Sequence, residues 1–542
     1  MATSAHVTCF LGSFLVFNPK FPFTIHTMRR TPFLTSLTRA LQTTRTSGMD
    51  SVFNYTSGRW LWNEEAQLAA RSISFNVEAL KQTACRALHA ESCTSLGKIG
   101  EGGFNKALRL IMDDGRTIIA KLPHPNAGPV KLTTSSEAAT MEYARSVLKL
   151  PVPKVFGWSD KKENLVESEY ILMEEAKGSQ LSSIWHGLPL KRKVHVIRGI
   201  VDVEARMMST PFDMIGSLYF GDPVIPGCRP IMNDGNIDST HRFSIGPITR
   251  REFWQDERAS MGHHGPWTSA TDYLQSIADR EIEWLSNFAH RHPQSRQPWQ
   301  HADPLQDSAD AHIASLNKFK AVIPDIVPRD EDLTKPRFWH PDFHAGNIYV
   351  DEEANITAII DWQGAWITPP FIGINPPSML DYGVDIMMKL PQTFNSLDET
   401  EKEKLRYQVS QSILITAYEA KTASINAPLI KMMRTPHGQT LKQLEAFANA
   451  TWDNYLYPFN ETLLRVQQEW SHFGLDGNCP YEFSASEMQQ HQDEAENFND
   501  SQRFWHNLRG VLSEDGYTTN DDYPCAVKVL KELHNTAERS PN

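Results

Sequence analysis

The segment "LGKIGEGGFNKALRLIMDDGRTIIAKL", which begins at Leu96, restricts the fold of this chain more than any other. Its apolar runs are separated first by a glycine-rich turn and then by Asp114-Gly115, a dipeptide that favours tight hairpins. Two further apolar runs, "VPKVFGW" and "ESEYILMEEAKG", follow downstream. We therefore expect residues 95–179 to form a small antiparallel sheet.

One helix is expected within this sheet region, over "SSEAATMEYARSVLKL", because its apolar residues have helical spacing. Ser135 or Ser136 can cap its start, and Pro151 requires the helix to stop shortly before it. The sheet and this helix together would make up one small lobe.

The remainder of the chain is mainly helical in pattern. Residues 222–335 hold loops rich in Pro, Gly and His, among which Thr271–Phe288 has helical spacing. Two longer helices are expected nearer the C-terminus, over "LDETEKEKLRYQVSQSILITAYEA" and "TLKQLEAFANATWDNYLYPFNETLLRVQQEW". The order predicts an α+β fold with two lobes, a small antiparallel-sheet lobe over residues 95–179 and a large helical lobe over residues 180–542.

The first 49 residues differ from the rest of the chain. They contain no Asp or Glu, five Lys or Arg and many Ser and Thr, and Phe33, Leu37 and Leu41 would share one face of a helix. These features are typical of a mitochondrial transit peptide, with a disordered tail as the alternative. A secretory signal is disfavoured because the apolar run "CFLGSFLVF" lacks a basic region before it. Residues 50–94 would form a helical lead-in.

Bulk composition excludes several classes of protein. The formal net charge of −12 argues against a nucleic-acid partner. Six scattered cysteines without a CxxC pair argue against a disulfide framework or a structural zinc site, and no apolar run is long enough for a transmembrane segment. His263-His264 lack the spacing of a zinc-binding pair on a helix, so we interpret them as loop residues.

Candidate nucleotide-binding residues lie in the sheet lobe. The glycines of "GEGG" would allow backbone N–H groups to approach phosphates, although, taken alone, they are better explained by a simple hairpin turn. The connector after the strand "YILM" would offer backbone groups to a base. The candidates are Gly100, Gly102, Gly103, Met173 and Glu175.

Lys121, near the end of "TIIAKL", is a charge on an apolar strand. Such a charge is costly to bury unless it is paired, so Lys121 either points to solvent or faces a carboxylate. Glu137 on the following helix is the natural partner, and Glu142 is the alternative. A paired lysine here would bind nucleotide phosphates.

The stretch "FWHPDFHAGNIYVDEEANITAIIDWQGAW", residues 338–366, contains two apolar strands around a polar turn. The hairpin would bring Asn347 and Asp361 close together, and their oxygens suit Mg²⁺. Asp342 would then accept a proton from a hydroxyl group or orient the acceptor. We interpret His340 as a brace of the loop, whereas His344 either faces substrate or fills space. The alternative is an acidic surface hairpin.

In combination, "HPDFHAGN" and "IIDWQGAW" resemble the motifs of the aminoglycoside phosphotransferase and choline-kinase-like superfamily, over roughly Leu96–Asp385. The resemblance implies a protein-kinase-like bilobal fold, ATP and Mg²⁺ as cofactors, and transfer of phosphate to a small-molecule hydroxyl. It implies that Asp342 is the catalytic aspartate, Asn347 and Asp361 are metal ligands, and Lys121 is the phosphate lysine, paired with Glu137.

The acid-free N-terminus and the motif "YTSGRWLWNE", which starts at Tyr55, extend this resemblance to the fungal mitochondrial family called altered inheritance of mitochondria protein 9. Asn105 stands where protein kinases keep a third glycine, which weakens the assignment of the phosphate loop. A protein kinase is disfavoured because no APE segment follows Asp361. The remaining alternative is a nucleotide-binding pseudokinase that acts as a mitochondrial scaffold or regulator. The acceptor site would involve residues 222–335 and the C-terminal helices.

Overall fold

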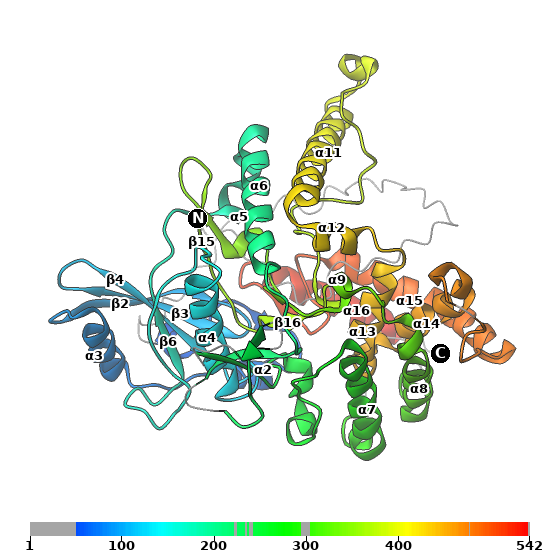
Figure 1. The fold of residues 1–542 in the computed structure, drawn as a ribbon, viewed down its shortest axis with the longest axis horizontal. Coiled ribbons are helices and arrows are strands. Elements are labelled where there is room, and N and C mark those ends of the chain that lie inside the picture. The colour runs from blue at the N-terminus through cyan, green and yellow to red at the C-terminus, as the bar shows by residue number, and fades with distance from the viewer. Residues whose placement is uncertain are drawn as a thin grey trace.

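The computed structural model describes residues 50–221, 225–233, 236–237, 242–293, 304–475 and 477–539. The expected transit peptide, residues 1–49, lies outside the described residues. The described chain has a strand-rich lobe on one side and a larger helical lobe on the other (Figure 1). The expected two-lobed α+β fold is confirmed.

The small lobe is built on a five-stranded antiparallel sheet with strand order β2-β3-β4-β6-β5. Buried side chains alternate along β3, as expected for a strand whose two faces have different environments, whereas the central residues of β4 are buried on both faces. One face packs with the helix α3 (Val77–Leu88) in a separate small core. The strands are β2 Cys93–Glu101, β3 Asn105–Met112, β4 Thr117–Pro123, β5 Val155–Ser159 and β6 Tyr170–Met173.

The helix α4 (Leu132–Ser146) covers the opposite side of the sheet and joins the main core of the large lobe. The prediction that Ser135 or Ser136 caps α4 is wrong. The helix begins earlier, at Leu132. The Thr133 N–H donates to the carbonyl of Pro129, and the Ser135 N–H donates to the carbonyl of Lys131, both of which precede the helix. Ser135 is therefore buried inside the helix, and its hydroxyl donates to Asp160 instead.

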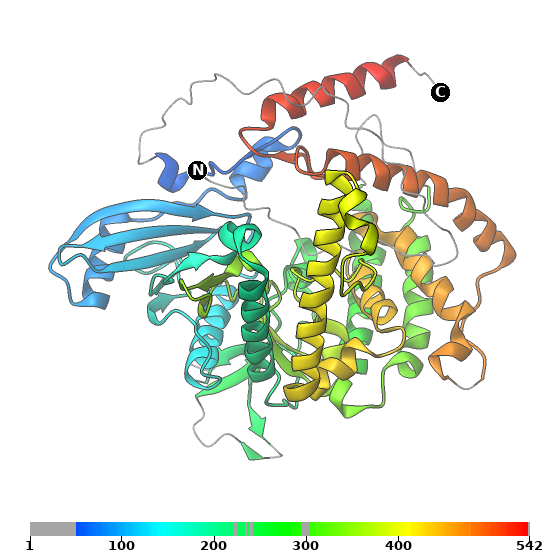
Figure 2. The same ribbon diagram turned by 90° about the horizontal axis from the view of Figure 1, so that it is seen from above.

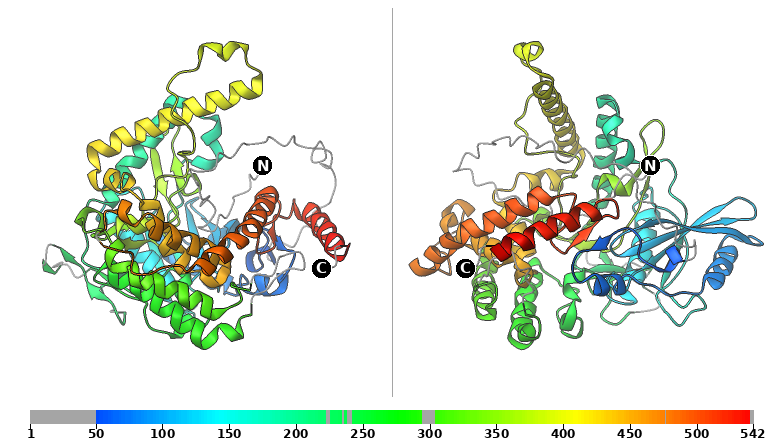
Figure 3. Two further views of the ribbon diagram at one scale, coloured as in Figure 1. Left: turned by 90° about the vertical axis from the view of Figure 1, so that its right-hand side faces the viewer. Right: turned by 180° about the vertical axis from the view of Figure 1, so that it is seen from behind.

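The helical lobe contains the expected helices over α7 and α11, and α11 lies beside α6 and extends away from the rest of the lobe (Figure 3). The second long helix predicted from the sequence is instead two helices, α13 and α14, because Asn454 between them adopts a left-handed conformation with φ of 67°. The main helices are α6 Leu190–Met207, α7 Ala270–Phe288, α8 Ala309–Ile326, α11 Glu399–Ile425, α12 Ala427–Met433, α13 Gly438–Ala448, α14 Leu456–Gln468, α15 Ala485–Leu508 and α16 Tyr523–Arg539.

Several elements of this lobe were not expected from the sequence. α8 packs against α7 in the region interpreted as loops. A three-stranded sheet, β8 (Ser217–Phe220), β9 (Arg229–Pro230) and β12 (Phe243–Gly246), forms beside α4. None of the helices among the described residues is long and apolar enough to cross a membrane.

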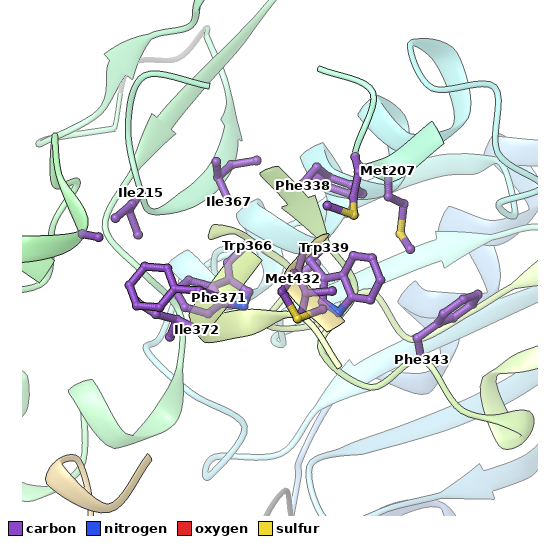
Figure 4. Packing of buried hydrophobic residues seen from close by; sticks show 14 of the residues in the cluster. Met207, Ile215, Phe338, Trp339, Phe343, Trp366, Ile367, Phe371, Ile372 and Met432 are labelled. Atoms are coloured by element: carbon purple, nitrogen blue, oxygen red, sulfur yellow. The ribbon is translucent and has the colours of Figure 1, made fainter. Parts of the chain in front are cut away.

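The predicted hairpin forms as β14 (Ile348–Val350) paired with β15 (Ile356–Ile359). Just before it, β13 (Arg337–Trp339) pairs with β16 (Trp366–Thr368), so both ends of the 338–366 stretch are joined. Figure 4 shows side chains of β13 and β16 gathered with side chains from α6 and α12. The stretch is therefore fixed to the main core of the large lobe and is not a free surface hairpin.

Glu204 of α6 makes a testable contribution to stability. Its side chain is fully buried next to the hydroxyl of Tyr418 on α11, and burial raises its pKa from 4.5 to about 8. Between about pH 4.5 and 8 the folded protein therefore keeps a proton that the unfolded chain releases. Stability should fall as pH rises through this range, by at most about 1.4 kcal/mol per pH unit.

We expect Glu204→Gln to remove this component, because the amide stays neutral at every pH. Denaturant unfolding of both proteins at several pH values from 5 to about 8 measures the difference. A pH slope that is equal in the two proteins would contradict the assignment.

Candidate active site

Lys121 lies on β4, a central strand of the small lobe, between Ala107 of β3 and Ile171 of β6. Its neighbours Ile118, Ala120 and Leu122 face the small core, so the alternation of the strand turns Lys121 to the opposite side, towards α4 and the large lobe. The side chain is buried, which excludes the interpretation that it points to solvent.

Two carboxylates neutralise this lysine. Its Nζ lies 2.6 Å from Glu137 Oε1 and 2.7 Å from Asp361 Oδ1. Burial opposes the charge on Lys121, but Asp361 and Glu137 outweigh burial and raise the pKa of the lysine. Glu142, the alternative partner, instead pairs with Arg242 on the far side of α4.

Asp361 lies two residues after the end of β15, and its contact with Lys121 joins the hairpin to the sheet lobe. It has a left-handed backbone with φ of 62°, which is uncommon outside glycine and which Asp and Asn tolerate best. Burial opposes ionisation, but Lys121 outweighs it, so the pKa of Asp361 is lowered. Its side chain remains 41% exposed, so the carboxylate is charged and open to a ligand.

Asp342 and Asn347 lie in the loop between β13 and β14. The Asn347 side-chain amide donates to the Asp342 carbonyl at 2.9 Å and to Asp342 Oδ2 at 3.3 Å. Asn347 is buried, whereas the Asp342 carboxylate is 43% exposed. The loop thus buries the Asn347 side-chain amide and exposes the Asp342 carboxylate to solvent.

His340 is the brace that the sequence predicts. It is fully buried, its Nε2 lies 3.0 Å from the Ile360 carbonyl, and its Nδ1 accepts from the Asp342 N–H at 3.1 Å. Burial lowers the pKa of His340, which favours the neutral ring that these two contacts require. His340 therefore ties the Asp342 loop to the strand that leads to Asp361.

The contact between His344 and Asp342 was not assigned from the sequence. The Gly346 N–H donates to His344 Nδ1 at 2.8 Å, so the proton of the neutral ring must be on Nε2. That nitrogen lies 3.2 Å from Asp342 Oδ2. The spacing of two residues from Asp342 is the only sequence signal that could have indicated it.

The glycine turn lies at the edge of the same site. Gly100 is part of β2 and pairs with Ala107, whereas Gly102 and Gly103 form the turn between β2 and β3. The turn is held by the large lobe, because the guanidinium of Arg251 lies 4.1 Å from the Phe104 ring centroid. In addition, the Asn105 side-chain amide donates to Gln363 Oε1 at 2.5 Å, only two residues after Asp361.

The connector after β6 leads from the sheet to the hairpin. Met173 ends β6 and pairs with Ile119, and Glu175 forms an ion pair with Arg109 on β3. Farther along, the Gln180 side chain donates to the Gly346 carbonyl at 2.6 Å. The Glu175 side chain is therefore paired with Arg109 within the sheet lobe. The connector itself reaches the loop that carries Asn347.

These residues come from five separate parts of the chain and meet where the two lobes join. A family model described as the phosphotransferase enzyme family matches residues 98–372, which is just over half of the chain and spans all of these residues. The chain belongs to this phosphotransferase family.

Relatives of this phosphotransferase-family protein cover most of its length. A subtelomeric hrmA-associated cluster protein of Aspergillus fumigatus is 30% identical over 82% of this chain and 93% of its own. Proteins named "Altered inheritance of mitochondria protein 9, mitochondrial" are 23% identical in Yarrowia lipolytica, over 81% of this chain and 80% of the relative, and 23% identical in Saccharomyces cerevisiae, over 82% and 83%. These names agree with the mitochondrial location expected from the sequence, and the predicted family resemblance is confirmed.

Two solved structures are similar to this phosphotransferase-family chain over most of their own length. A putative fructosamine-3-kinase from Thermobifida fusca is 14% identical and covers 72% of this chain and 100% of its own, with a TM-score of 0.38. The streptomycin–ATP complex of the aminoglycoside phosphotransferase APH(2'')-IIa is 10% identical and covers 73% and 98%, with a TM-score of 0.37.

The donor set of the phosphotransferase site fits Mg²⁺. Because Asn347 donates with its nitrogen to Asp342, its oxygen faces the other way, and Asp361 Oδ2 accepts no hydrogen bond from the described residues. An amide oxygen and a carboxylate oxygen are ligands that Mg²⁺ accepts when it also keeps waters and phosphate oxygens. The part of the chain that the structure describes has no group of three or more His, Cys, Asp or Glu arranged to hold a metal alone. His263 and His264 are loop residues, as expected.

Proposed function

We propose that this protein is an ATP- and Mg²⁺-dependent phosphotransferase that acts on a hydroxyl group of a small molecule in mitochondria. One observation carries the proposal. Lys121 of the small lobe pairs at once with Glu137 and with Asp361 of the large lobe, next to the loop that exposes Asp342. Charge arranged in this way across a lobe junction is suited to binding a phosphate chain on a metal.

The proposed reaction assigns a separate role to each side chain. Lys121 would bind phosphate oxygens while Glu137 holds it in place, and Asn347 and Asp361 would hold Mg²⁺. When bound, Mg²⁺ neutralises the negative charge of the phosphates. Asp342 would accept the acceptor proton as the acceptor oxygen bonds to the γ-phosphorus and the bond to ADP breaks.

Gly100, Gly102, Gly103, Met173 and Glu175 would contribute around the nucleotide, mainly through backbone groups. The acceptor site would face Asp342 from the large lobe. Loop residues of this type position substrates more than they react with them, so catalysis would consist largely of alignment and charge neutralisation.

The alternative is a nucleotide-binding scaffold that uses the same site without transferring phosphate. A phosphotransferase and a scaffold would both bind Mg·ATP, so a measurement of phosphate transfer is needed to distinguish the two functions. We would incubate the protein that starts at Asp50 with γ-labelled ATP and either a metabolite extract or a protein extract. Label in the metabolite fraction supports the proposal. Label only in protein would identify a protein kinase, and binding without transfer would identify a scaffold.

His344 is expected to set the orientation of Asp342. Its Nε2–H would hold Oδ2, which leaves Oδ1 for the acceptor hydroxyl. We expect His344→Ala to lower kcat by about tenfold, the usual effect of losing a hydrogen bond to a charged group, with little change in the KM for ATP. Steady-state kinetics with the labelled acceptor measures both constants.

His195→Ala is the matched control, because that exposed ring contacts Asn355 at the tip of the same hairpin, away from Asp342. An unchanged kcat in His344→Ala would show that His344 only fills space.

A further inference from the structure

The motif "YTSGRWLWNE" has no part in the proposed reaction, yet its first residues lie against the glycine turn. The Thr56 N–H donates to Glu101 Oε2 at 2.7 Å, and the Thr56 hydroxyl donates to the same oxygen at 3.4 Å. The Ser57 hydroxyl donates to the Glu101 carbonyl at 3.0 Å and lies 3.3 Å from its carboxylate. Glu101 is the last residue of β2, so these contacts hold both the side chain and the main chain where the turn begins.

Glu101 is bound in a buried cluster of charges. Its side chain is only 1% exposed, with Lys98 Nζ at 2.8 Å and Lys106 Nζ at 3.0 Å. Lys106 is fully buried and also donates to the carbonyls of Val52 and Asn54, at 2.8 and 3.1 Å. Buried charges that lose a partner are costly, so this cluster favours a single arrangement of the turn relative to residues 52–57.

The C-terminal part of the chain holds the motif from the other side. β1 (Arg59–Trp60) pairs with β17 (Tyr517–Thr518), where the lead-in meets the last segments of the chain (Figure 2). The Tyr517 hydroxyl donates to the Ser57 carbonyl at 3.1 Å, and the Asn520 side chain donates to the Thr56 carbonyl at 2.8 Å. The same two residues that bind Glu101 are therefore also bound by residues 517–520.

Gly58 makes the close approach of these two segments possible. A Cβ atom at this position would lie 2.6 Å from the Thr518 carbonyl oxygen, closer than such atoms come in real structures. The strand pair β1–β17 thus requires glycine at position 58 because a side chain would not fit there. Backbone conformation is not the reason, since Gly58 does not have a left-handed backbone.

The turn is fixed at two places. Its tip contacts Arg251 and Gln363 of the large lobe, and its start contacts Thr56 and Ser57. At Gly102, between them, a Cβ would meet no atom within 4 Å, so the turn itself has room to move. A loop that is ordered before its ligand arrives loses less conformational entropy on binding.

We propose that residues 55–60, held by residues 517–520, position the glycine turn for nucleotide binding, so that the C-terminal segment sets the affinity of the site. Thr56 and Ser57 are positioning residues in this scheme and touch neither the nucleotide nor the acceptor. The inference rests on the proposed function only for the identity of the ligand, Mg·ATP.

The test is the double variant Thr56→Ala/Ser57→Ala in the full chain, with Thr94→Ala as its control. Thr94 is an exposed hydroxyl residue at the opposite end of β2. Hydrogen–deuterium exchange of residues 99–106 is measured without nucleotide, and the Kd for Mg·ATP is measured separately. We expect exchange in the turn and Kd each to rise about tenfold in the double variant and to stay unchanged in the control.

Two further variants separate positioning from a general loss of structure. Thr56→Ser/Ser57→Thr keeps both hydroxyls and should restore the Kd. Gly58→Ala should open β1–β17 and raise exchange in the turn, although it alters no contact of Glu101 directly. If Gly58→Ala does not fold, the exchange and the Kd of the Thr56→Ala/Ser57→Ala variant still test whether residues 55–60 position the turn.

Unchanged exchange in the turn of the double variant would overturn the proposal, and so would a Kd that stays unchanged while exchange rises. If wild-type protein fails to bind Mg·ATP, the proposed function fails. The exchange measurement then decides separately whether residues 55–60 order the turn.

Discussion

Asp342→Asn is expected to lower phosphoryl transfer by roughly a hundred- to ten-thousandfold while Mg·ATP binding is kept. Asparagine has nearly the same shape as aspartate and can still accept hydrogen bonds from His344 and Asn347. It cannot take up the proton of the acceptor hydroxyl, so only the chemical step should suffer. Label transfer to the acceptor measures the rate, and thermal shift measures binding.

The matched control for this change is Asp351→Asn in the turn of the same hairpin. Asp351 accepts from the backbone and the side chain of Asn355, so it holds the tip together, away from Asp342. We expect its transfer rate to stay within about twofold of wild type. Full activity in Asp342→Asn, or equal losses in both variants, would contradict the role assigned to Asp342.

Lys121→Met is expected to affect both stability and binding. The change leaves the Glu137 carboxylate, 4% exposed, without its cation, and breaking a buried pair in this way costs about 3–5 kcal/mol of folding free energy. It also removes the proposed phosphate contact, which should weaken Mg·ATP binding by roughly 2–5 kcal/mol. Urea unfolding and calorimetric titration measure the two effects.

The double variant Lys121→Met/Glu137→Gln separates these effects, because a neutral partner no longer needs the cation. We expect it to regain most of the lost stability but none of the binding. Lys161→Met, at an exposed lysine of the same lobe, serves as the control for the substitution itself. Restored binding in the double variant would show that Lys121 acts only through Glu137.

Local sequence patterns predicted the parts of the fold that depend on short-range physics. Asp114-Gly115 correctly marked the β3–β4 turn, and the apolar run "TIIAKL" correctly placed Lys121 on a strand. The choice of Glu137 over Glu142 also agrees with the structure, since helical spacing turns Glu137 towards β4. In each case the residues involved lie close together in the sequence, and Lys121 and Glu137 are only 16 positions apart.

Contacts between distant segments could not be predicted in this way. The start of α4 at Leu132 has no capping signal in the sequence, because Lys131 precedes it and makes no side-chain cap. The contact of Lys121 with Asp361 joins residues 240 positions apart, and the pairing of β1 with β17 joins the two ends of the described chain. A single sequence contains no physical signal for such pairs. The contacts of residues 55–60 with the glycine turn and with residues 517–520 were therefore found only in the structure.

Lys121, Asp361 and Asn347 are proposed to bind Mg·ATP at the junction of the lobes. The most direct measurement is the stabilisation of wild type and Asp361→Asn by ATP with and without Mg²⁺. At a ligand concentration of 100 times Kd, wild type should gain about 2.7 kcal/mol with Mg·ATP, and Asp361→Asn should gain far less. No stabilisation of wild type, or equal stabilisation of both proteins, would contradict the claim.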